Sequence, residues 1–403
     1  MSRSSGLVLG RRQVGGFGIG PRLKLGERSS LLVVGATQSG KTSSLVIPAL
    51  LHWPGAAVVC SVKRDLYDVT AQYRSEVGDV TVLDPGREAG ATWNPLEGVT
   101  SYRHAMRVAR DMVLPTPPAG ESAFWNALSV KLLGTLLALA IERNEDIFSV
   151  VQVLENRDFG RWSYQGIPSL ASETLDNFLR YEPKTLDGVC TTTETMLLPW
   201  RFRQPLATVR NVVSGPNSLF MCSPKGEQSH YEPLFRGALR MVLEEQQTLR
   251  DRHEQRPLLV VLDEAAAVAS LDDLDQIAAT VSGLDVTLVT VVQDFAQLTA
   301  RWGAKAPTIV NNHTTRLVFG GLADPSASTF IPELIFEGKK ARKLRELPLG
   351  TAVLVAGRKP AVVLSTKGWW RQRELKQKIP KHGSVPLEGE RTAEIRQRRH
   401  SRL

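Results

Sequence analysis

Residues 35–42 have the sequence Gly35-Ala36-Thr37-Gln38-Ser39-Gly40-Lys41-Thr42, which matches the phosphate-binding pattern Gly-x-x-x-x-Gly-Lys-Thr at every defined position. The apolar residues 31–34 precede this loop. A helix-compatible stretch at 43–51, with a kink expected at Pro48, follows it. A strand, this loop and a helix in that order turn backbone N–H groups toward phosphate oxygens. The stretch therefore predicts a phosphate-binding α/β fold; a glycine-rich turn before a helix is the alternative.

The residue types of the loop suit a nucleotide with a bound magnesium ion. We expect the backbone from Gly35 to Ser43 to surround the phosphates of ATP, with Lys41 at the β- and γ-phosphates. The hydroxyl of Thr42 is the expected protein ligand of Mg²⁺ on this segment.

A second motif supplies the carboxylates that such a site needs. Residues 258–262 are five consecutive apolar residues that lead into Asp263 and Glu264. We predict a buried strand beside the phosphate-loop strand, which delivers Asp263 to Mg²⁺ and Glu264 to the attacking water. Residues 80–84 are a rival, because they are also largely apolar and end at Asp84. They lack the second carboxylate and Pro85 follows at once, which favours a turn residue.

Two polar side chains are candidates for accessory roles. Gln293 follows the apolar run 286–292, where it could sense the γ-phosphate or simply end a strand. Arg316 precedes another apolar run and could neutralise transition-state charge across a subunit boundary. Arg301 and Arg236 compete with Arg316 for that role.

The composition indicates a soluble globular protein. The 403 residues are 42% hydrophobic and 23% charged, and the length suggests two to three domains. The three cysteines are far apart, which favours a reducing compartment and argues against a disulfide or zinc framework. No signal peptide is evident, and the apolar stretch 132–141 is too short to span a bilayer and favours a buried helix. We expect a cytoplasmic protein.

The net charge of +9 is concentrated at the two ends of the sequence. Residues 1–29 contain six Lys or Arg and one Glu, and residues 371–403 contain ten Lys or Arg and four Glu. We expect a basic N-terminal arm and a basic C-terminal tail. Such segments contact nucleic acid, anionic lipid or an acidic partner; a solvated tail is the alternative for residues 371–403.

The order of apolar runs predicts a nucleotide-binding domain in two parts. Short strands alternate with helices in 30–99, which indicates a parallel sheet, and the same pattern returns in 201–370. Residues 100–200 instead show apolar side chains at helical spacing. We therefore expect an α/β fold with an inserted all-α domain at 100–200.

Several segments together resemble the type IV secretion coupling proteins, the ATPases of conjugative DNA transfer, over roughly residues 30–365. Residues 59–67 resemble an Asp-Pro-Lys-Gly-Glu-Leu segment of that family, although Ser61-Val62 replaces Asp-Pro and Arg64-Asp65 replaces Gly-Glu. Further similarity lies in Leu83-Asp84-Pro85, Trp93-Asn94-Pro95-Leu96, Phe124-Trp125, the run 292–298 with Trp302-Gly303, the run 312–316, and the run 320–325 that ends in Asp324-Pro325.

The resemblance implies a RecA-like, P-loop NTPase domain with an all-α insertion, working as a homo-hexamer. It implies DNA and a relaxase or secreted protein as substrates, and secretion-channel subunits as partners. It raises Gln293 to a nucleotide sensor and Arg316 to a residue acting in trans. Most members begin with two transmembrane helices, which are not seen here, so we expect a soluble form recruited to the inner face of the membrane, with a separate membrane anchor as one possibility.

Two other functions remain open from the sequence. One is a related DNA-pumping ATPase of chromosome partition or end processing, which the helical segment 100–200 disfavours. The other is a nucleotide-gated substrate receptor without motor activity, which the intact Asp263-Glu264 pair disfavours because a pure binder does not need Glu264.

Overall fold

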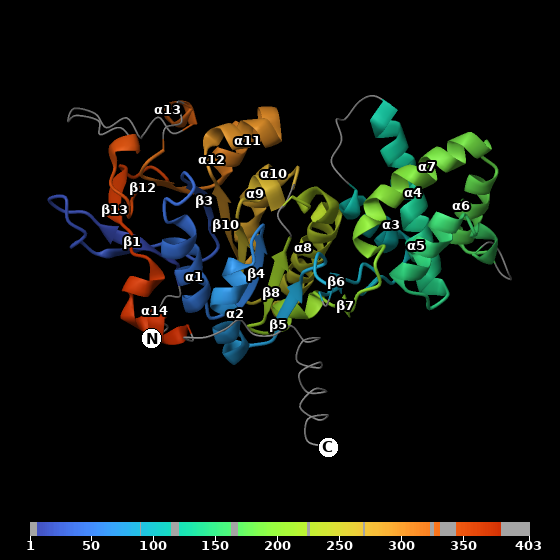
Figure 1. The fold of residues 1–403 in the computed structure, drawn as a ribbon, viewed down its shortest axis with the longest axis horizontal. Helices are drawn as coiled ribbons and strands as arrows, with labels where there is room; N and C mark the ends of the chain where they lie inside the picture. The colour runs from blue at the N-terminus through green and yellow to red at the C-terminus, as the bar shows by residue number, and fades with distance from the viewer. Residues whose placement is uncertain are drawn as a thin grey trace, which may run out of the picture. The chain divides into compact units, whose positions relative to one another are not determined.

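The computed structural model describes residues 6–88, 90–113, 121–162, 168–223, 226–268, 271–322, 326–330 and 344–379 (Figure 1). The chain forms two compact units. The first, here called the sheet unit, contains residues 1–82, 211–225 and 245–403. The second, here called the helical unit, contains residues 83–210 and 226–244.

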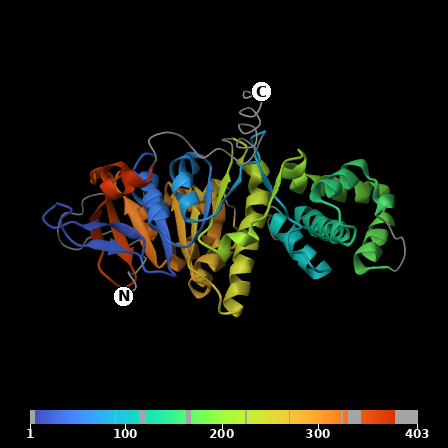
Figure 2. The same ribbon diagram turned by 90° about the horizontal axis from the view of Figure 1, so that it is seen from below.

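Among the described residues, eleven strands form one sheet in the order β2-β1-β13-β12-β11-β3-β10-β9-β4-β8-β5. Helices lie on both faces of this sheet (Figure 2). The strand bounds are β1 Val8–Arg12, β2 Arg22–Lys24, β3 Ser30–Val34, β4 Ala56–Ser61, β5 Val80–Leu83, β8 Ser218–Cys222, β9 Leu258–Leu262, β10 Val286–Val292, β11 Thr315–Phe319, β12 Thr351–Ala356 and β13 Val362–Ser365.

The six strands from β11 to β8 in this order run parallel to one another, whereas β11 pairs with β12 in antiparallel orientation. Five of these six, β3, β4, β8, β9 and β10, are buried along their whole length. Continuous Val and Leu runs are typical of parallel strands covered on both faces, because neither face meets water. The expected α/β fold with a largely parallel sheet is confirmed.

One expectation about the strand order was wrong. The sequence analysis placed the Asp263 strand directly beside the phosphate-loop strand, but β10 lies between β3 and β9. Val292 of β10 pairs with Val34, and Thr290 pairs with Leu262. All three strands are largely apolar and buried along their whole length, so their pattern carries no information about which is the neighbour of which.

The N-terminal residues are not a separate arm in the part that the structure describes. Strands β1 and β2 extend the sheet, and β1 pairs with β13 in antiparallel orientation. These two strands join the sheet because Leu7, Leu9 and Leu25 pack into the core of the sheet unit. The alternating leucines of this segment, rather than its basic charge, therefore determine where it lies.

The helix after the phosphate loop begins with a widened turn. A π-type turn spans Thr42–Val46, in which the Ile47 N–H donates to the Thr42 carbonyl, and α1 spans Ile47–His52. Pro48 has no N–H group to continue the regular helical ladder. The irregularity expected at Pro48 therefore lies one turn earlier, directly behind the loop.

The other helices of the sheet unit cover the parallel strands and the sheet's antiparallel end. Their bounds are α2 Asp65–Val77, α9 Ala265–Val268, α10 Leu274–Thr280, α11 Phe295–Trp302, α12 Ala306–Asn312, α13 Ala327–Phe330 and α14 Arg373–Lys378. Of the expected basic tail 371–403, residues 371–379 include α14, and residues 380–403 lie outside the described part.

The helical unit is built around α4, which packs against α3, α5, α6 and α7. By length and composition α4 is the one described helix that could span a membrane, but residues 132–140 are buried inside the unit. The bounds are α3 Tyr102–Met112, α4 Glu121–Glu142, α5 Ile147–Asn156, α6 Leu170–Leu179 and α7 Pro183–Leu197.

The helical unit also includes residues outside the expected range 100–200. Strands β6 (Thr92–Trp93) and β7 (Leu206–Ala207) pair in parallel, and the larger part of α8 (Gln228–Asp251) belongs to this unit. The buried carboxylate of Glu97 accepts hydrogen bonds from the Val209 and Arg210 N–H groups at 2.9 and 3.0 Å. Burial raises the pKa of Glu97 to about 7, against the opposing effect of these bonds.

Arg74 on α2 stabilises the sheet unit from within. Its fully buried guanidinium donates to Ser218 Oγ at 2.7 Å and to the carbonyls of Trp53, Gly55 and Pro216 at 2.7–2.9 Å. We predict that Arg74→Ala lowers the free energy of unfolding by about 3 kcal/mol, because buried acceptors lose their donor. Urea denaturation measures this. Glu76→Ala, at an exposed position of the same helix, is the control; an equal loss there would contradict the prediction.

Candidate functional site

The loop after β3 has the backbone shape of an anion-binding loop. Gln38 has a φ of 63° and Gly40 a φ of 94°, so left-handed residues reverse the chain within the loop. A Cβ atom on Gly35 would lie 2.7 Å from Ser39 Oγ and 2.8 Å from Phe319 Cβ, so only glycine fits there. Residues 36–38 are partly or fully exposed, whereas Ser39 and Lys41 are buried.

Lys41 lies against the inside of the loop. Its ammonium donates to the carbonyl oxygens of Gly35 and Ala36, the latter at 2.9 Å, and the residue is 8% exposed. Burial lowers the pKa of Lys41, while Asp263 and Glu264 act in the opposite direction. The ammonium is thus held against the loop carbonyls and interacts electrostatically with the two carboxylates.

The hydroxyl groups of the loop suit a phosphate and a metal ion. Ser39 Oγ is buried without a hydrogen-bond partner, and Ser43 Oγ donates back to the Gly40 carbonyl at 3.3 Å. In the described residues no group of three or more His, Cys, Asp or Glu could hold a metal by itself. Mg²⁺ prefers one or two protein oxygens together with phosphate oxygens and waters. Thr42 and Asp263 fit that pattern.

Asp263 and Glu264 follow directly after β9. The Asp263 N–H donates to the Cys60 carbonyl at 2.9 Å, which continues the pairing of β9 with β4. Burial raises the pKa of Asp263 to about 6, with further contributions from Asp65 and Glu264; Lys41 opposes them. Glu264 is in the left-handed region with a φ of 56°, at the turn into α9.

The structure adds two residues that the sequence analysis did not select. Lys63 and Asp65 follow β4, and Lys63 Nζ lies 4.0 Å from Glu264 Oε1. Asp65 begins α2 and acts electrostatically on Asp263. The sequence did contain a signal for these two residues, because the carboxyl ends of parallel strands meet at one edge of the sheet. The residues after β4 therefore had to lie near those after β9.

Gln293 follows β10, the strand between β3 and β9. The preceding carbonyl, of Val292, accepts the Gly35 N–H at 3.3 Å, and the Gln293 N–H donates to Gln297 Oε1 at 2.9 Å. The strand register thus places its backbone between the phosphate loop and the Asp263 strand. Its role as a sensor stays a prediction.

Within a single chain, Arg316 lies apart from the group formed by Lys41, Asp263 and Glu264. Its Nε donates to the His313 carbonyl at 3.3 Å, and the residue pairs with Leu32, two positions before the end of β3. Of its competitors, Arg236 donates to the Val113 carbonyl at 2.8 Å inside the helical unit. Arg301 lies on α11. Action in trans by any of the three stays a prediction.

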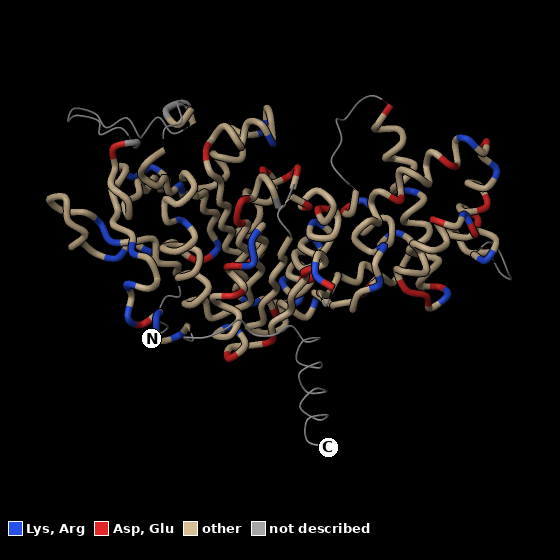
Figure 3. Tube along the Cα trace, in the orientation of Figure 1, with Lys and Arg blue, Asp and Glu red and all other residues tan. Residues whose placement is uncertain are grey.

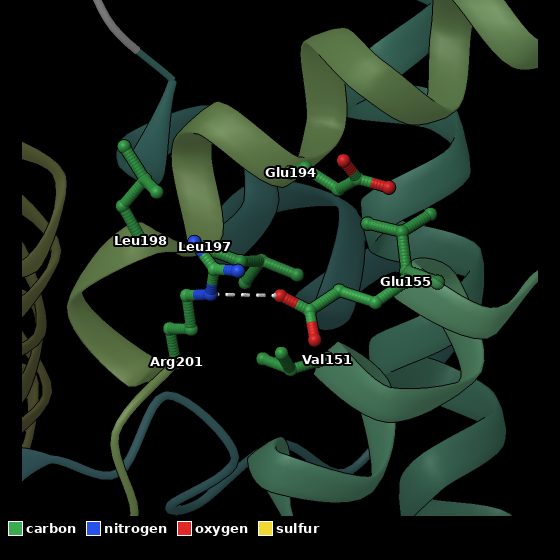
Figure 4. Close-up of a pocket in the computed structure, with 7 residues that line it drawn as sticks. Val151, Glu155, Glu194, Leu197, Leu198 and Arg201 are labelled. Atoms are coloured by element: carbon green, nitrogen blue, oxygen red, sulfur yellow. Dashed lines mark ion pairs between the residues drawn. The ribbon is translucent and has the colours of Figure 1, made fainter.

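The helical unit contains a separate cavity of about 340 Å³ that the sequence did not indicate (Figure 4). Its wall includes Leu197, Leu198 and Val151, and Arg201 Nε lies 3.3 Å from Glu155 Oε1. Glu194, also in the wall, pairs with Arg157. The acidic groups therefore already have basic partners, and the cavity presents no unbalanced charge of its own.

The fold and the loop together define a P-loop α/β protein. A family model described as "Type IV secretory system Conjugative DNA transfer" matches residues 4–163, and one described as "TraM recognition site of TraD and TraG" matches residues 257–344. Two separate parts of the chain are thus similar to models of the type IV secretion coupling proteins. The segment Asp324-Pro325 used in the resemblance lies outside the described residues.

Two curated relatives are similar to this chain at low identity. The conjugal transfer protein TraG of Escherichia coli is 26% identical over 315 residues, which are 67% of this chain and 49% of that protein. Protein VirD4 of Rhizobium radiobacter is 22% identical over 361 residues, which are 83% of this chain and 52% of that protein. The chain thus spans about half the length of the relatives it matches.

Solved structures share the fold. The bacterial conjugative coupling protein TrwBdeltaN70, in an unbound form, superposes with a TM-score of 0.70 at 18% identity, covering 89% of this chain and 88% of that one. TrwB in complex with ADP and Mg²⁺ gives 0.65 at 17% identity, covering 89% of each chain. VirB4 of Thermoanaerobacter pseudethanolicus gives 0.56 at 13% identity, covering 91% and 98%.

His313, in the run 312–316, is a buried structural residue. Its Nδ1 lies 2.7 Å from the Ile309 carbonyl and its Nε2 2.9 Å from Thr290 Oγ1, and burial lowers its pKa to about 4. Below pH 6.5 His313 is therefore protonated in the unfolded chain, whereas in the folded chain it becomes protonated only near pH 4. Stability from this residue is present above pH 6.5 and lost as the pH falls.

We predict that His313→Gln weakens the dependence of stability on pH between about 7 and 5, because the titrating group is gone. Urea unfolding at several pH values measures the slope. The comparison is with the slope of the unsubstituted protein, since carboxylates contribute equally to both. Identical slopes would mean that His313 is not held neutral.

Proposed function

We propose that this chain binds and hydrolyses ATP with Mg²⁺ and uses the energy to deliver DNA, or a DNA–protein substrate, to a type IV secretion channel. The observation that carries the proposal is the convergence of Lys41, Asp263 and Glu264 at the carboxyl edge of β3 and β9. A buried lysine beside two carboxylates is the charge arrangement that P-loop motors use.

In this proposal each residue has one task. The backbone N–H groups of residues 35–43 and the Lys41 ammonium bind the phosphates, and Lys41 exchanges its bonds to the loop carbonyls for phosphate oxygens. Glu264 accepts a proton from the attacking water. Lys63, 4.0 Å from Glu264, orients that carboxylate and balances its charge. Gln293 senses the γ-phosphate from the tip of β10.

Mg²⁺ would be held by Thr42 and Asp263. When bound, it would neutralise charge that develops on the phosphate oxygens. The carboxylate of Asp263 is raised in pKa by burial and by neighbouring acids, so a dication there would favour its ionised form.

The partners follow from the family. TraG and VirD4 relatives and the match to a TraM recognition region support a DNA-transfer role with a TraM-like or relaxase partner. Assembly as a homo-hexamer, with Arg316 acting across the subunit boundary and channel subunits or a separate anchor at the inner face of the cytoplasmic membrane, belongs to the same proposal. A partition-type DNA pump has less support, because the family matches include the conjugative DNA-transfer model.

We predict that Lys41→Ala abolishes ATP turnover and weakens nucleotide binding, whereas Glu264→Gln retains binding and lowers turnover by a factor of about 100 or more. The reason is that Lys41 contacts the phosphates and Glu264 contacts only the water. Binding of a fluorescent ATP analogue and phosphate release separate the two. Wild-type turnover in Lys41→Ala would refute the site, and lost binding in Glu264→Gln would refute the role of Glu264.

We predict that DNA stimulates the steady-state ATPase rate several-fold, because a translocating motor couples hydrolysis to its track. Rates with single-stranded, double-stranded and no DNA, with Lys41→Ala as the blank, measure this. Multiple turnovers that DNA leaves unchanged would favour a protein-secretion role. Binding without multiple turnovers would favour the nucleotide-gated receptor.

A further inference from the structure

The β1–β2 hairpin ends in an exposed apolar tip. Val14, Phe17 and Ile19 are 52%, 71% and 73% exposed. They lie within six consecutive residues at the outer end of the sheet unit's antiparallel strands (Figure 1). Scattered exposed apolar side chains are common, but three large ones on one loop tip mark an interaction surface.

The tip has a defined shape. Val14 and Phe17 exchange both backbone hydrogen bonds, at 2.8 and 3.1 Å, across a two-residue turn in which Gly15 and Gly16 have φ values of 60° and 85°. This tight hairpin turn fixes the Val14 and Phe17 side chains on the same face. A Cβ atom on Gly15 or Gly16 would meet no atom within 4 Å, so the turn itself stands clear of the surrounding structure.

The strands behind the tip are basic. Residues 6–26 contain Arg11, Arg12, Arg22 and Lys24 and no Asp or Glu (Figure 3). Arg12 and Arg22 are exposed and have no ion-pair partner among the described residues. The surface therefore combines an apolar end with cationic side chains two to five residues behind it on both strands.

We propose that this hairpin is a membrane-docking element, which inserts Val14, Phe17 and Ile19 into the interface of an anionic bilayer. Aromatic and aliphatic side chains partition into the boundary between headgroups and acyl chains, and guanidinium groups just behind them meet lipid phosphates. A protein partner would have to present an apolar pocket inside an acidic rim. A bilayer with anionic lipid supplies both features over a continuous surface, without the need for a matching shape.

The assignment is independent of the nucleotide site. Lys41, Asp263 and Glu264 lie after β3 and β9 in the middle of the strand order, whereas the hairpin forms one end of it, beyond β13. Hairpin variants should therefore leave ATP hydrolysis unchanged, and a failure of the ATPase proposal would not affect lipid binding.

The test is co-sedimentation of the full chain with vesicles of phosphatidylcholine containing about one third phosphatidylglycerol, and with pure phosphatidylcholine. We expect binding to the anionic vesicles only, weakened at high salt because the arginine contacts are screened. Phe17→Ser/Ile19→Ser should lower the partition coefficient by a factor of about 10 or more. Arg12→Gln/Arg22→Gln should lower it and reduce the salt dependence.

The matched control is Phe202→Ser. Phe202 is 71% exposed, as Phe17 is, but its neighbours are engaged: Arg201 pairs with Glu155, and Arg203 lies over the Phe148 ring. We expect this variant to bind like the parent chain. Absence of binding by the parent chain, or full binding by Phe17→Ser/Ile19→Ser, would overturn the proposal. A change in oligomer mass, with lipid binding unaffected, would instead assign the tip to contact with a second copy.

Discussion

The site depends on one constraint, namely that parallel strands deliver their following residues to a single edge of the sheet. The register pairs Val34 with Val292 and Leu262 with Thr290, so the phosphate loop, Gln293 and Asp263 all begin at nearly the same level. The apolar runs end at Val34, Leu262 and Val292, so a shift in one direction would pull a residue such as Asp263 into the buried part of the sheet. Residues distant in sequence thereby form one cluster.

That cluster is electrostatically balanced only as a whole. Lys41 is buried, and a buried ammonium is costly unless carboxylates lie nearby. The buried carboxylate of Asp263 is likewise unfavourable in its ionised form, and the charges of Asp65 and Glu264 raise its pKa further. Lys63 adds a second positive charge next to Glu264. A bound nucleotide with a dication would change every one of these interactions. The protonation of the site's lysines and carboxylates would therefore depend on whether the ligand is bound.

The middle of the strand order and its β2 end have different roles in our proposals. The parallel part carries the site, and the antiparallel strands at the β2 end carry the hairpin that we propose docks on lipid. The alternating leucines that anchor β1 and the exposed residues of its tip belong to the same short segment. A protein that docks on a membrane through its own sheet would need no flexible link between the lipid contact and the nucleotide site.

The sequence alone was sufficient for the α/β class and for the resemblance to the coupling proteins, because these depend on local patterns and on motifs with fixed spacing. It also marked the phosphate loop and the Asp263-Glu264 pair, whose roles stay predictions. It could not order β3, β10 and β9, since all three are equally apolar. It also did not reveal that Lys63 and Asp65 join the site, that Arg316 lies beside His313, or that residues 8–24 enter the sheet. Only the tertiary structure decides these, because they depend on which buried strands are neighbours, a property of packing that no single segment encodes.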